Sequence, residues 1–475
     1  MNRRTLLRTA GLAGIVGASG CATPLDSLLG SDGNGSSGTD EANGTVGSLD
    51  SGGAGGTDGP SGTAGADGEI AGTSTATERD GTPTATPEAP ETRSGAALTG
   101  VYPGGPEFVS NLTPYTEWLG QPSAVVLLFV DALGPTENKR WFVEQPLTNV
   151  WQAGHVPMIS WQPFTDERGQ TPETIERMVA EGEYDDELAE WASLLASWAR
   201  PQGDRTRGRR FYIRPAHEMN GNWFPWGSLD ATRIDATVTP VPGGSENATE
   251  TLPGASRAAG TPEEYVEMWQ RLYEAFDETA LDDTDMQWVW AVNADQVPTD
   301  NRTERYYPGD EYVDWTAIDG FNFGATQSYS SWRTPDELYD PMLGRLRELT
   351  DKPVALTEFA STSFIETASE GSDGESANDG EYRPERKTEW IEAVYEYIDE
   401  NDIKMACWFD IDKDGSDEAD WSVFDGGHGT ATVQLSGEEY RAYEAYKRTV
   451  TGERFLAART DYPSLLTDAE FAGEF

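Results

Sequence analysis

The stretch RRFYIRPAHEM, residues 209–219, is an apolar run that carries a histidine and a glutamate near its end. Seven other apolar runs of strand length occur along the chain, at residues 96–104, 123–132, 155–164, 286–295, 315–324, 352–361 and 404–412. Continuous apolar runs are typical of strands that are buried on both faces, as in a parallel sheet covered by helices. The sequence therefore predicts eight parallel strands.

Amphipathic segments separate these runs, and several begin with Thr-Pro or Pro-Glu, as helix N-termini do. The clearest lie at residues 171–182, 185–200, 261–280, 334–350 and 384–401. Strands that alternate with helices predict an α/β fold, and eight repeats predict closure into a (β/α)8 TIM barrel over residues 97–475. An open doubly wound sheet is the alternative, but no glycine-rich phosphate loop follows the first run.

The N-terminus carries twin arginines, Arg3 and Arg4, before an apolar run that is too short to span a bilayer. We interpret residues 1–21 as a twin-arginine signal peptide. Small residues before Cys21 resemble a lipobox, which predicts export and anchoring to the cell membrane by lipid at Cys21. The alternative is that Cys21 lies in a discarded signal peptide. Residues 22–96, rich in Gly, Ser, Thr and Asp, predict a disordered linker.

Acidic residues outnumber basic residues by 83 to 34, which gives a formal charge of −49. Acidity spread along the whole chain is typical of proteins from halophilic archaea, because carboxylates keep the surface hydrated in concentrated salt. A nucleic-acid partner is disfavoured, since basic residues are not clustered. The two cysteines, Cys21 and Cys407, offer neither a disulfide pair after processing nor a zinc cluster. We expect a monomer without cofactor or metal.

Two glutamates stand at the ends of predicted strands. Glu218 lies near the C-terminal end of the fourth run, and Glu358 lies at the corresponding position of the seventh run, KPVALTEFAS. Reacting groups of such barrels come from the C-terminal ends of strands. An isolated glutamate there is usually solvated, but two carboxylates at one barrel mouth are the equipment of glycoside hydrolysis, in which one protonates the leaving oxygen and the other attacks the anomeric carbon.

Tryptophans accompany these strand ends. Sugar rings have apolar faces edged with hydroxyls, so a sugar cleft needs aromatic platforms together with polar groups. Five tryptophans fall at or near strand ends, namely Trp161, Trp223, Trp226, Trp290 and Trp408. For each of them a place in the core is an equal alternative. Four others lie in helical segments and are assigned to packing: Trp191, Trp198, Trp269 and Trp390.

The stretch RPAHEMNGNWFPWG, residues 214–227, resembles the strand-four signature of glycoside hydrolase family 26, whose best-known members are β-mannanases of clan A. His217 precedes the glutamate, where other clan A families usually have asparagine. The resemblance extends over about residues 97–450 and includes MISWQP, WVWAVN, YYPGDEYVDWTAIDGFNFG, KPVALTEFAS and CWFDIDKDG.

The resemblance implies a retaining hydrolase of β-1,4-mannan or a related β-glycan, with Glu218 as acid/base and Glu358 as nucleophile. It implies that His217 binds the sugar at the −1 site and that Trp223 and Trp226 wall the cleft. Further substrate contacts are expected from Arg214, Trp161, Trp290, Asn293, Phe321 and Trp408. The asparagine of the motif, which this prediction assigns to position 219, is expected to contribute as well. Phe321 stands where many members have a tyrosine that touches the nucleophile. Arg214, Asn322 and Tyr329 are open as replacements for its hydroxyl.

Other functions stay open. The substrate could be β-1,3-xylan or mixed-linkage glucan, and a non-catalytic, lipid-anchored protein that binds polysaccharide or solute is a further alternative. The stretch DIDKDGSDEAD, residues 410–420, has the carboxylate spacing of a calcium loop. It lacks the glutamate expected at the twelfth position, where Trp421 stands, so a cleft-closing loop is favoured.

Overall fold

The computed structural model describes residues 89–104, 108–166, 168–201, 208–227, 260–299, 301–327, 330–365, 381–414 and 418–475. The expected signal peptide, Cys21, most of the linker and Tyr329 lie outside the described residues.

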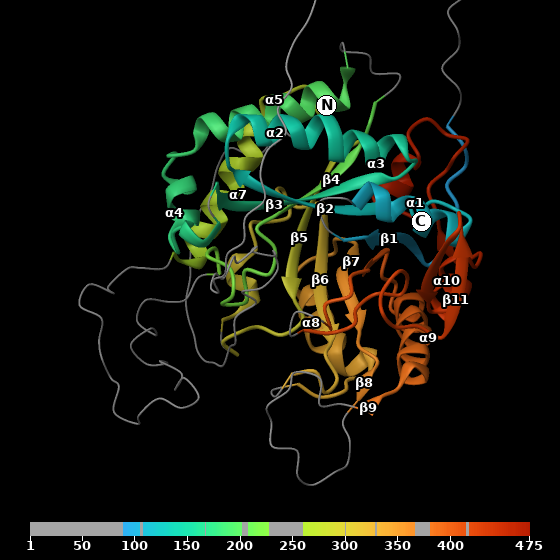
Figure 1. Ribbon diagram of the computed structural model, residues 1–475. Helices are drawn as coiled ribbons and strands as arrows, with labels where there is room; N and C mark the ends of the chain where they lie inside the picture. Colours follow the sequence, from blue (N-terminus) through green and yellow to red (C-terminus); the bar gives the residue numbers. More distant parts are fainter. Residues whose placement is uncertain are drawn as a thin grey trace, which may run out of the picture. The chain divides into compact units, whose positions relative to one another are not determined.

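The eight predicted strands all form, and they lie parallel, in chain order, around a closed barrel (Figure 1). They are β1 (Ala97–Tyr102), β2 (Val125–Leu133), β3 (Val156–Thr165), β4 (Phe211–Pro215), β5 (Met286–Asn293), β6 (Trp315–Asn322), β7 (Val354–Ser361) and β10 (Met405–Phe409). Pairing of β10 with β1 closes the ring. The fold is a (β/α)8 TIM barrel, as the sequence predicts, and the open sheet is excluded.

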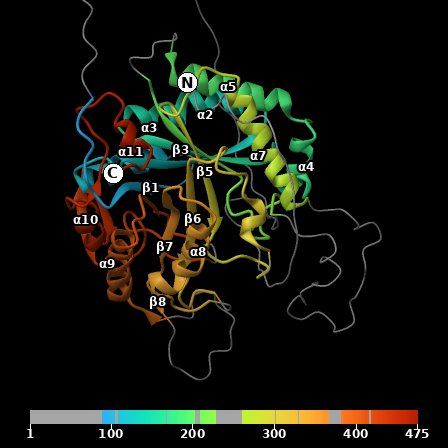
Figure 2. The same ribbon diagram turned by 180° about the vertical axis from the view of Figure 1, so that it is seen from behind.

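Helices surround the strands when the molecule is seen from the front and from behind (Figure 1 and Figure 2). They are α1 (Phe108–Leu119), α2 (Thr136–Phe142), α3 (Thr148–Gln152), α4 (Ile175–Ala180), α5 (Asp185–Ala199), α7 (Pro262–Asp277), α8 (Pro335–Leu349), α9 (Pro384–Glu400), α10 (Glu444–Val450) and α11 (Asp468–Phe471). The five predicted helical segments correspond to α4, α5, α7, α8 and α9. Thr261 and Glu264 form a capping box at the start of α7, with Pro262 as its first residue, as the Thr-Pro signal indicates.

Shorter elements decorate the barrel. Two antiparallel hairpins are formed by β8 (Phe364–Ile365) with β9 (Glu381–Tyr382) and by β11 (Ala431–Leu435) with β12 (Glu438–Ala442). Single helical turns lie at η2 (Val143–Leu147), η3 (Arg168–Gln170) and η6 (Thr303–Tyr306). A ninth parallel strand, β13 (Phe455–Leu456), pairs with β1.

Strand alternation divides the apolar core into two layers. In β5, Val289 and Ala291 belong to the cluster inside the barrel, whereas Trp288 and Trp290 belong to the cluster between strands and helices. The outer cluster also holds the helical tryptophans that were predicted to pack, namely Trp191, Trp198, Trp269 and Trp390. Successive side chains of a strand point to opposite faces, so the parity of a position decides whether it faces the barrel interior or the helices.

The C-terminal segment packs against the N-terminal ends of the strands. The ring of Phe471 in α11 lies 4.6 Å from that of Tyr212 in β4. Glu470 is fully buried and binds Arg459 and Arg93. Arg93 lies within the predicted linker, which therefore ends several residues before position 96.

Cys407 is buried and unpaired. None of the helices among the described residues is both long and apolar enough to cross a membrane.

Candidate active site

The turn after β4 presents Glu218 in an unusual backbone conformation. Ala216 and Glu218 have φ values of 43° and 55°, in the left-handed region that residues other than glycine seldom adopt. Backbone hydrogen bonds hold this turn, because the amide of Ala216 donates to Trp161 in β3 and that of Glu218 donates to Ala291 in β5. Strained backbone of this kind clusters at functional sites and persists only where neighbouring strands impose it.

Glu218 is buried and receives one hydrogen bond on each carboxyl oxygen. Asn293, the last residue of β5, donates to Oε1 at 2.7 Å, and the indole of Trp223 donates to Oε2 at 2.7 Å. Burial and the charge of Glu358 outweigh these hydrogen bonds and raise the pKa of Glu218 to about 7. A carboxyl group with this pKa keeps its proton to a higher pH than an exposed glutamate does.

The sequence around Trp223 allows its indole to reach Glu218. A Cβ atom at Gly221 would lie 2.4 Å from the Trp223 ring, so only glycine leaves room for the ring to fold back over the turn. Trp223 itself is half-buried.

Glu358 in β7 is buried beside a cation. Arg214 donates from Nη2 to Oε1 of Glu358, and Nε2 of His217 lies 3.7 Å from the same oxygen. Asn322, one of the alternatives for this contact, instead donates to Ser361 at 2.9 Å. Of the three alternatives, Arg214 donates to Glu358, Asn322 does not, and Tyr329 lies outside the described residues.

Arg214 is fully buried and joins three strands below the two glutamates. Its Nη1 donates to Asp319 of β6 at 2.7 Å, and its Nη2 donates to Ser160 of β3 at 2.7 Å. Burial raises the pKa of Asp319 well above its ordinary value, against the influence of Arg214. Asp319 was not singled out from the sequence, although a charged residue inside the apolar run 315–324 was a signal that could have found it.

His217 carries no positive charge in this site. Burial, with help from the charge of Arg214, lowers the pKa of His217 well below its ordinary value. Its ring lies between those of Phe129, at 5.7 Å, and Phe224, at 5.0 Å. His217 can therefore act as a neutral hydrogen-bonding group next to Glu358.

The structure places several expected substrate contacts away from the two glutamates. Trp161, Trp226, Trp290 and Trp408 are fully buried and belong to the outer cluster. The alternation of side chains along a strand explains why these tryptophans face outward. Ser160 reaches Arg214 inside the barrel, so its neighbour Trp161 points toward the helices. Trp226 stacks on Phe224 at 4.5 Å.

Position 219 holds Met219, which is buried, and the asparagine of the motif is Asn220. Asn220 binds the backbone of Asn293 in both directions, accepting from its N–H and donating to its carbonyl, each at 2.8 Å. Asn220 thus orients Asn293, and through it Glu218, rather than offering its own amide to a ligand.

An aromatic group lies at the ends of β1, β6 and β10, and sequence reasoning named its members Phe321 and Trp421 but missed Tyr102 and Phe409. The ring of Phe409 lies 5.0 Å from Tyr102 and 5.4 Å from Phe321. Trp421 packs on Phe321 at 5.1 Å. Burial, with a smaller contribution from the charge of Glu358, raises the pKa of Tyr102.

The carboxylates of the calcium-like stretch have protein donors. Asp410 accepts from the backbone amides of Val423 and Phe424, and Asp420 accepts from Thr362 at 2.6 Å. Among the described residues, no group of three or more acidic, histidine or cysteine side chains could hold a metal ion.

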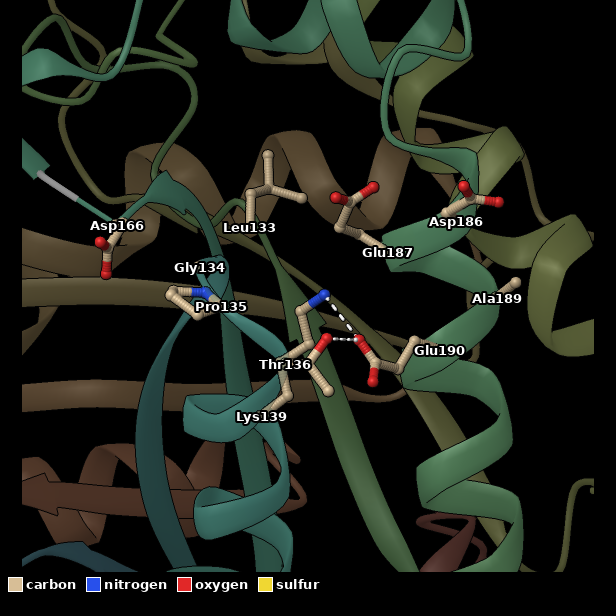
Figure 3. Close-up of a pocket in the computed structure, with 10 residues that line it drawn as sticks. All are labelled: Leu133, Gly134, Pro135, Thr136, Lys139, Asp166, Asp186, Glu187, Ala189 and Glu190. Carbon is tan, nitrogen blue, oxygen red and sulfur yellow. Dashed lines mark hydrogen bonds and ion pairs between the residues drawn. The ribbon is translucent and has the colours of Figure 1, made fainter.

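A pocket of about 710 Å³ lies beside the loop after β2 and the first turns of α5 (Figure 3). Its lining consists of Leu133, Gly134, Pro135, Thr136, Lys139, Asp166, Asp186, Glu187, Ala189 and Glu190. None of these ten residues is aromatic, so the pocket offers no platform for the face of a sugar ring.

Comparisons with known proteins point to one family. The model of glycosyl hydrolase family 26 matches residues 156–343. Endoglucanase H of Acetivibrio thermocellus is 27% identical over 277 residues, which are 58% of this chain and 23% of the relative. Mannan endo-1,4-beta-mannosidase A and B of Caldalkalibacillus mannanilyticus is 29% identical over 134 residues, 28% of this chain and 20% of the relative. The chain thus spans about a quarter of the length of these curated relatives or less.

Among solved structures, the catalytic domain of the Bacillus sp. JAMB-750 GH26 endo-beta-1,4-mannanase aligns with a TM-score of 0.48 and 17% identity, over 79% of this chain and 89% of that chain. The family model matches the segment from β3 into α8, residues 156–343, which contains Glu218 and ends before Glu358.

Proposed function

We propose that this protein is a retaining glycoside hydrolase that cleaves a β-linked polysaccharide of the mannan type. The proposal rests on one observation: two buried carboxyl groups have different neighbours, neutral donors in one case and a cation in the other. Glu218 has neutral hydrogen-bond donors and a pKa of about 7, and Glu358 is bound by the guanidinium group of Arg214. An acid must hold a proton and a nucleophile must be ionised, and these surroundings favour one of each.

The reaction takes two displacements. In the first, an oxygen of Glu358 attacks the anomeric carbon, the glycosidic C–O bond breaks, and the leaving oxygen takes its electron pair and the proton of Glu218. In the second, water attacks the same carbon, Glu218 accepts a proton from the water, and Glu358 leaves as carboxylate. The two inversions together retain the anomeric configuration.

The proton affinity of Glu218 follows this cycle. The negative charge of Glu358 is one of the two main influences that raise the pKa of Glu218. That charge disappears when Glu358 becomes an ester, so the pKa of Glu218 falls in the glycosyl-enzyme. Glu218 is then an anion that serves as base for the attacking water. Asn293 and Trp223 stabilise this anion through their hydrogen bonds.

The family match and the relatives named mannan endo-1,4-beta-mannosidase support mannan as the substrate. The relative named Endoglucanase H supports a β-glucan as the second candidate. Locust bean gum, barley β-glucan, curdlan and β-1,3-xylan, incubated with the protein in molar salt, test both candidates through the release of reducing ends. Release from locust bean gum alone supports the mannan assignment, and release from barley glucan alone replaces it.

A non-catalytic binding protein would retain the polysaccharide in an affinity gel and release no reducing ends from any of the four. Glu218→Ala and Glu358→Ala are the blanks for this assay. Equal, low signals from the blanks and the unmodified protein would contradict a hydrolase.

Export, the lipid anchor at Cys21 and a salt requirement belong to the same proposal. They rest on the twin arginines, the small residues before Cys21 and the charge of −49. Cys21→Ser should release the protein from the membrane fraction into the medium, whereas an unchanged distribution would contradict lipid anchoring.

A further inference from the structure

The C-terminal ends of β2 and β3 carry a polar group that the proposed reaction does not yet use. Asp131 of β2 and Gln162 of β3 are direct neighbours across the two strands. Arg168, in the helical turn η3, binds both: its Nε donates to Oδ2 of Asp131 at 2.6 Å, and its Nη2 donates to Oε1 of Gln162 at 3.1 Å. Nη2 also pairs with Oδ1 of Asp131, so one whole edge of the guanidinium group holds the carboxylate. We call these three residues the Arg168 group.

Strand alternation places the Arg168 group in the mouth of the barrel. Along β2, Val125 and Leu127 belong to the apolar cluster inside the barrel, so Phe129 and Asp131 face inward as well. Cζ of Arg214 lies 5.6 Å from the centre of the Phe129 ring. Asp131 follows two residues later, about 7 Å further along the strand. The Arg168 group therefore lies one layer closer to the mouth than Phe129.

Phe129 connects this part of the mouth to the two glutamates by direct contacts. Its ring lies 4.8 Å from that of Tyr102 and 5.7 Å from that of His217. Nε2 of His217 lies 3.7 Å from Oε1 of Glu358, and Glu218 is the next residue in the chain. The Arg168 group thus stands beside the aromatic and polar side chains that surround the proposed reacting pair.

The guanidinium group of Arg168 keeps one edge for a ligand. Among the described residues, none accepts a hydrogen bond from its Nη1, whereas Nε and Nη2 are both engaged. Cζ lies 4.6 Å from the centre of the Phe164 ring, which supports the cation. The side chains of Arg168 and Asp131 are 29% and 31% exposed, so solvent reaches both. Because the charges of this pair cancel, it suits a neutral ligand with hydroxyl groups better than an anion.

We propose that Arg168 and Asp131 bind two hydroxyl groups of one sugar unit of the polysaccharide, while Gln162 and Phe164 hold Arg168 in place. Nη1 of Arg168 donates to one hydroxyl oxygen, and Oδ2 of Asp131 accepts from a second hydroxyl. A hydroxyl group can donate and accept, so a donor beside an acceptor matches two hydroxyls of one ring. This inference rests on the proposed function for the identity of the ligand, but binding can be measured without turnover.

Titration calorimetry with mannohexaose and with cellohexaose tests this role. The measurements use Glu218→Gln, which lacks the proposed acid and leaves the oligosaccharide intact. In this background Arg168→Met, or Arg168→Gln if the first variant does not fold, should weaken binding by about 10-fold to 100-fold, because a hydrogen bond from a charged group is lost. Failure of both oligosaccharides to bind Glu218→Gln would overturn the proposal.

Arg345→Met is the matched control. Arg345 lies on α8 and binds Glu304 through the same two nitrogens, Nε at 2.7 Å and Nη2 at 2.8 Å. These side chains are 29% and 27% exposed, nearly the same as in the pair of Arg168 and Asp131. Arg345→Met should leave the affinity for the oligosaccharide unchanged. An equal loss of affinity in Arg345→Met and Arg168→Met would overturn the proposal.

Arg168→Lys separates ligand binding from a purely structural ion pair. Lysine keeps a positive charge beside Asp131 but lacks the second edge of nitrogen donors, so this variant should bind as weakly as Arg168→Met. Asp131→Asn keeps the shape of the side chain but loses the charged acceptor, and it should also weaken binding. Full affinity in Arg168→Lys would show that only the ion pair matters, which contradicts a contact with the ligand.

Failure of the hydrolase is a separate outcome. If the unmodified protein cleaves no polysaccharide but Arg168→Met weakens oligosaccharide binding, the binding role stands and the hydrolase is rejected. If the unmodified protein cleaves polysaccharide, and neither Arg168→Met nor Asp131→Asn changes the affinity or kcat/KM, the hydrolase stands and the role of Arg168 and Asp131 is wrong.

Discussion

Arg214 and Glu358 form an ion pair inside the barrel although 144 positions separate them in the chain. The same guanidinium group binds Asp319 with its other terminal nitrogen, so one cation binds two buried carboxyl groups. The stability of the site and the role proposed for Glu358 therefore depend on the same side chain.

Arg214→Met should destabilise the protein strongly. Removing the cation leaves Glu358 and Asp319 buried without a counter-ion, which costs about 3 to 5 kcal/mol in the free energy of unfolding. Urea unfolding at pH 7 measures the loss. Arg271→Met is the control, because Arg271 pairs with Asp185 at the surface and should change the free energy of unfolding by less than about 1 kcal/mol. Equal effects of the two changes would contradict the buried network.

Glu218 should make the protein less stable as the pH rises. Its pKa is about 7 in the folded protein and near 4.5 in the unfolded chain, so between these values the folded state binds the extra proton. The contribution of Glu218 is present below pH 4.5 and is lost as the pH rises through 7. The amide of Glu218→Gln does not titrate, so this variant escapes the loss. Relative to the unmodified protein, its free energy of unfolding should therefore rise by up to about 3 kcal/mol as the pH increases from 4.5 to 7.

Urea unfolding of both proteins at pH 4.5, 6 and 8 measures this difference. Glu389→Gln, which removes an exposed carboxylate paired with Arg386, is the control and should show no such trend. A difference between Glu218→Gln and the unmodified protein that stays constant with pH would refute the raised pKa.

Glu470 should stabilise the protein in the opposite pH range. The hydrogen bonds from Arg459 and Arg93 outweigh burial and lower its pKa to about 2, below the ordinary value of 4.5. Its contribution is present above pH 4.5 and is lost as the pH falls toward 2. Glu470→Gln should therefore lower the free energy of unfolding by about 2 to 3 kcal/mol at pH 7 and by much less near pH 2. A loss of the same size at both values would show that packing, and not charge, is what the substitution removes.

Azide should separate the roles of the two glutamates. Glu218→Ala should lose about 10²-fold to 10⁴-fold in activity on polysaccharide but still react with a dinitrophenyl glycoside, whose leaving group needs no acid. Azide then resolves the glycosyl-enzyme without a base and yields the β-glycosyl azide. In Glu358→Ala no covalent intermediate forms, and azide enters the vacated space to yield the α-glycosyl azide. NMR of the two products gives their anomeric configurations, and the reverse assignment would exchange the roles of Glu218 and Glu358.

The sequence determined the barrel and the positions of the two candidate glutamates along its strands. Eight apolar runs predicted eight strands within a few residues, because burial on both faces leaves no room for polar alternation in a parallel sheet. Glu218 and Glu358 could be placed at one mouth for the same reason, since all parallel strands end on the same side.

Only the tertiary structure decided which neighbours these glutamates have. Ser160 and Trp161 are adjacent in one apolar run, and closure of the barrel turned Ser160 toward Arg214 and Trp161 toward the helices. Arg214 and Glu358 come from different strands, and no periodicity in the chain predicts their contact. A pattern along the chain records whether a position is buried, but the pKa of a buried group depends on the distance and charge of residues that folding brings from far away in the sequence.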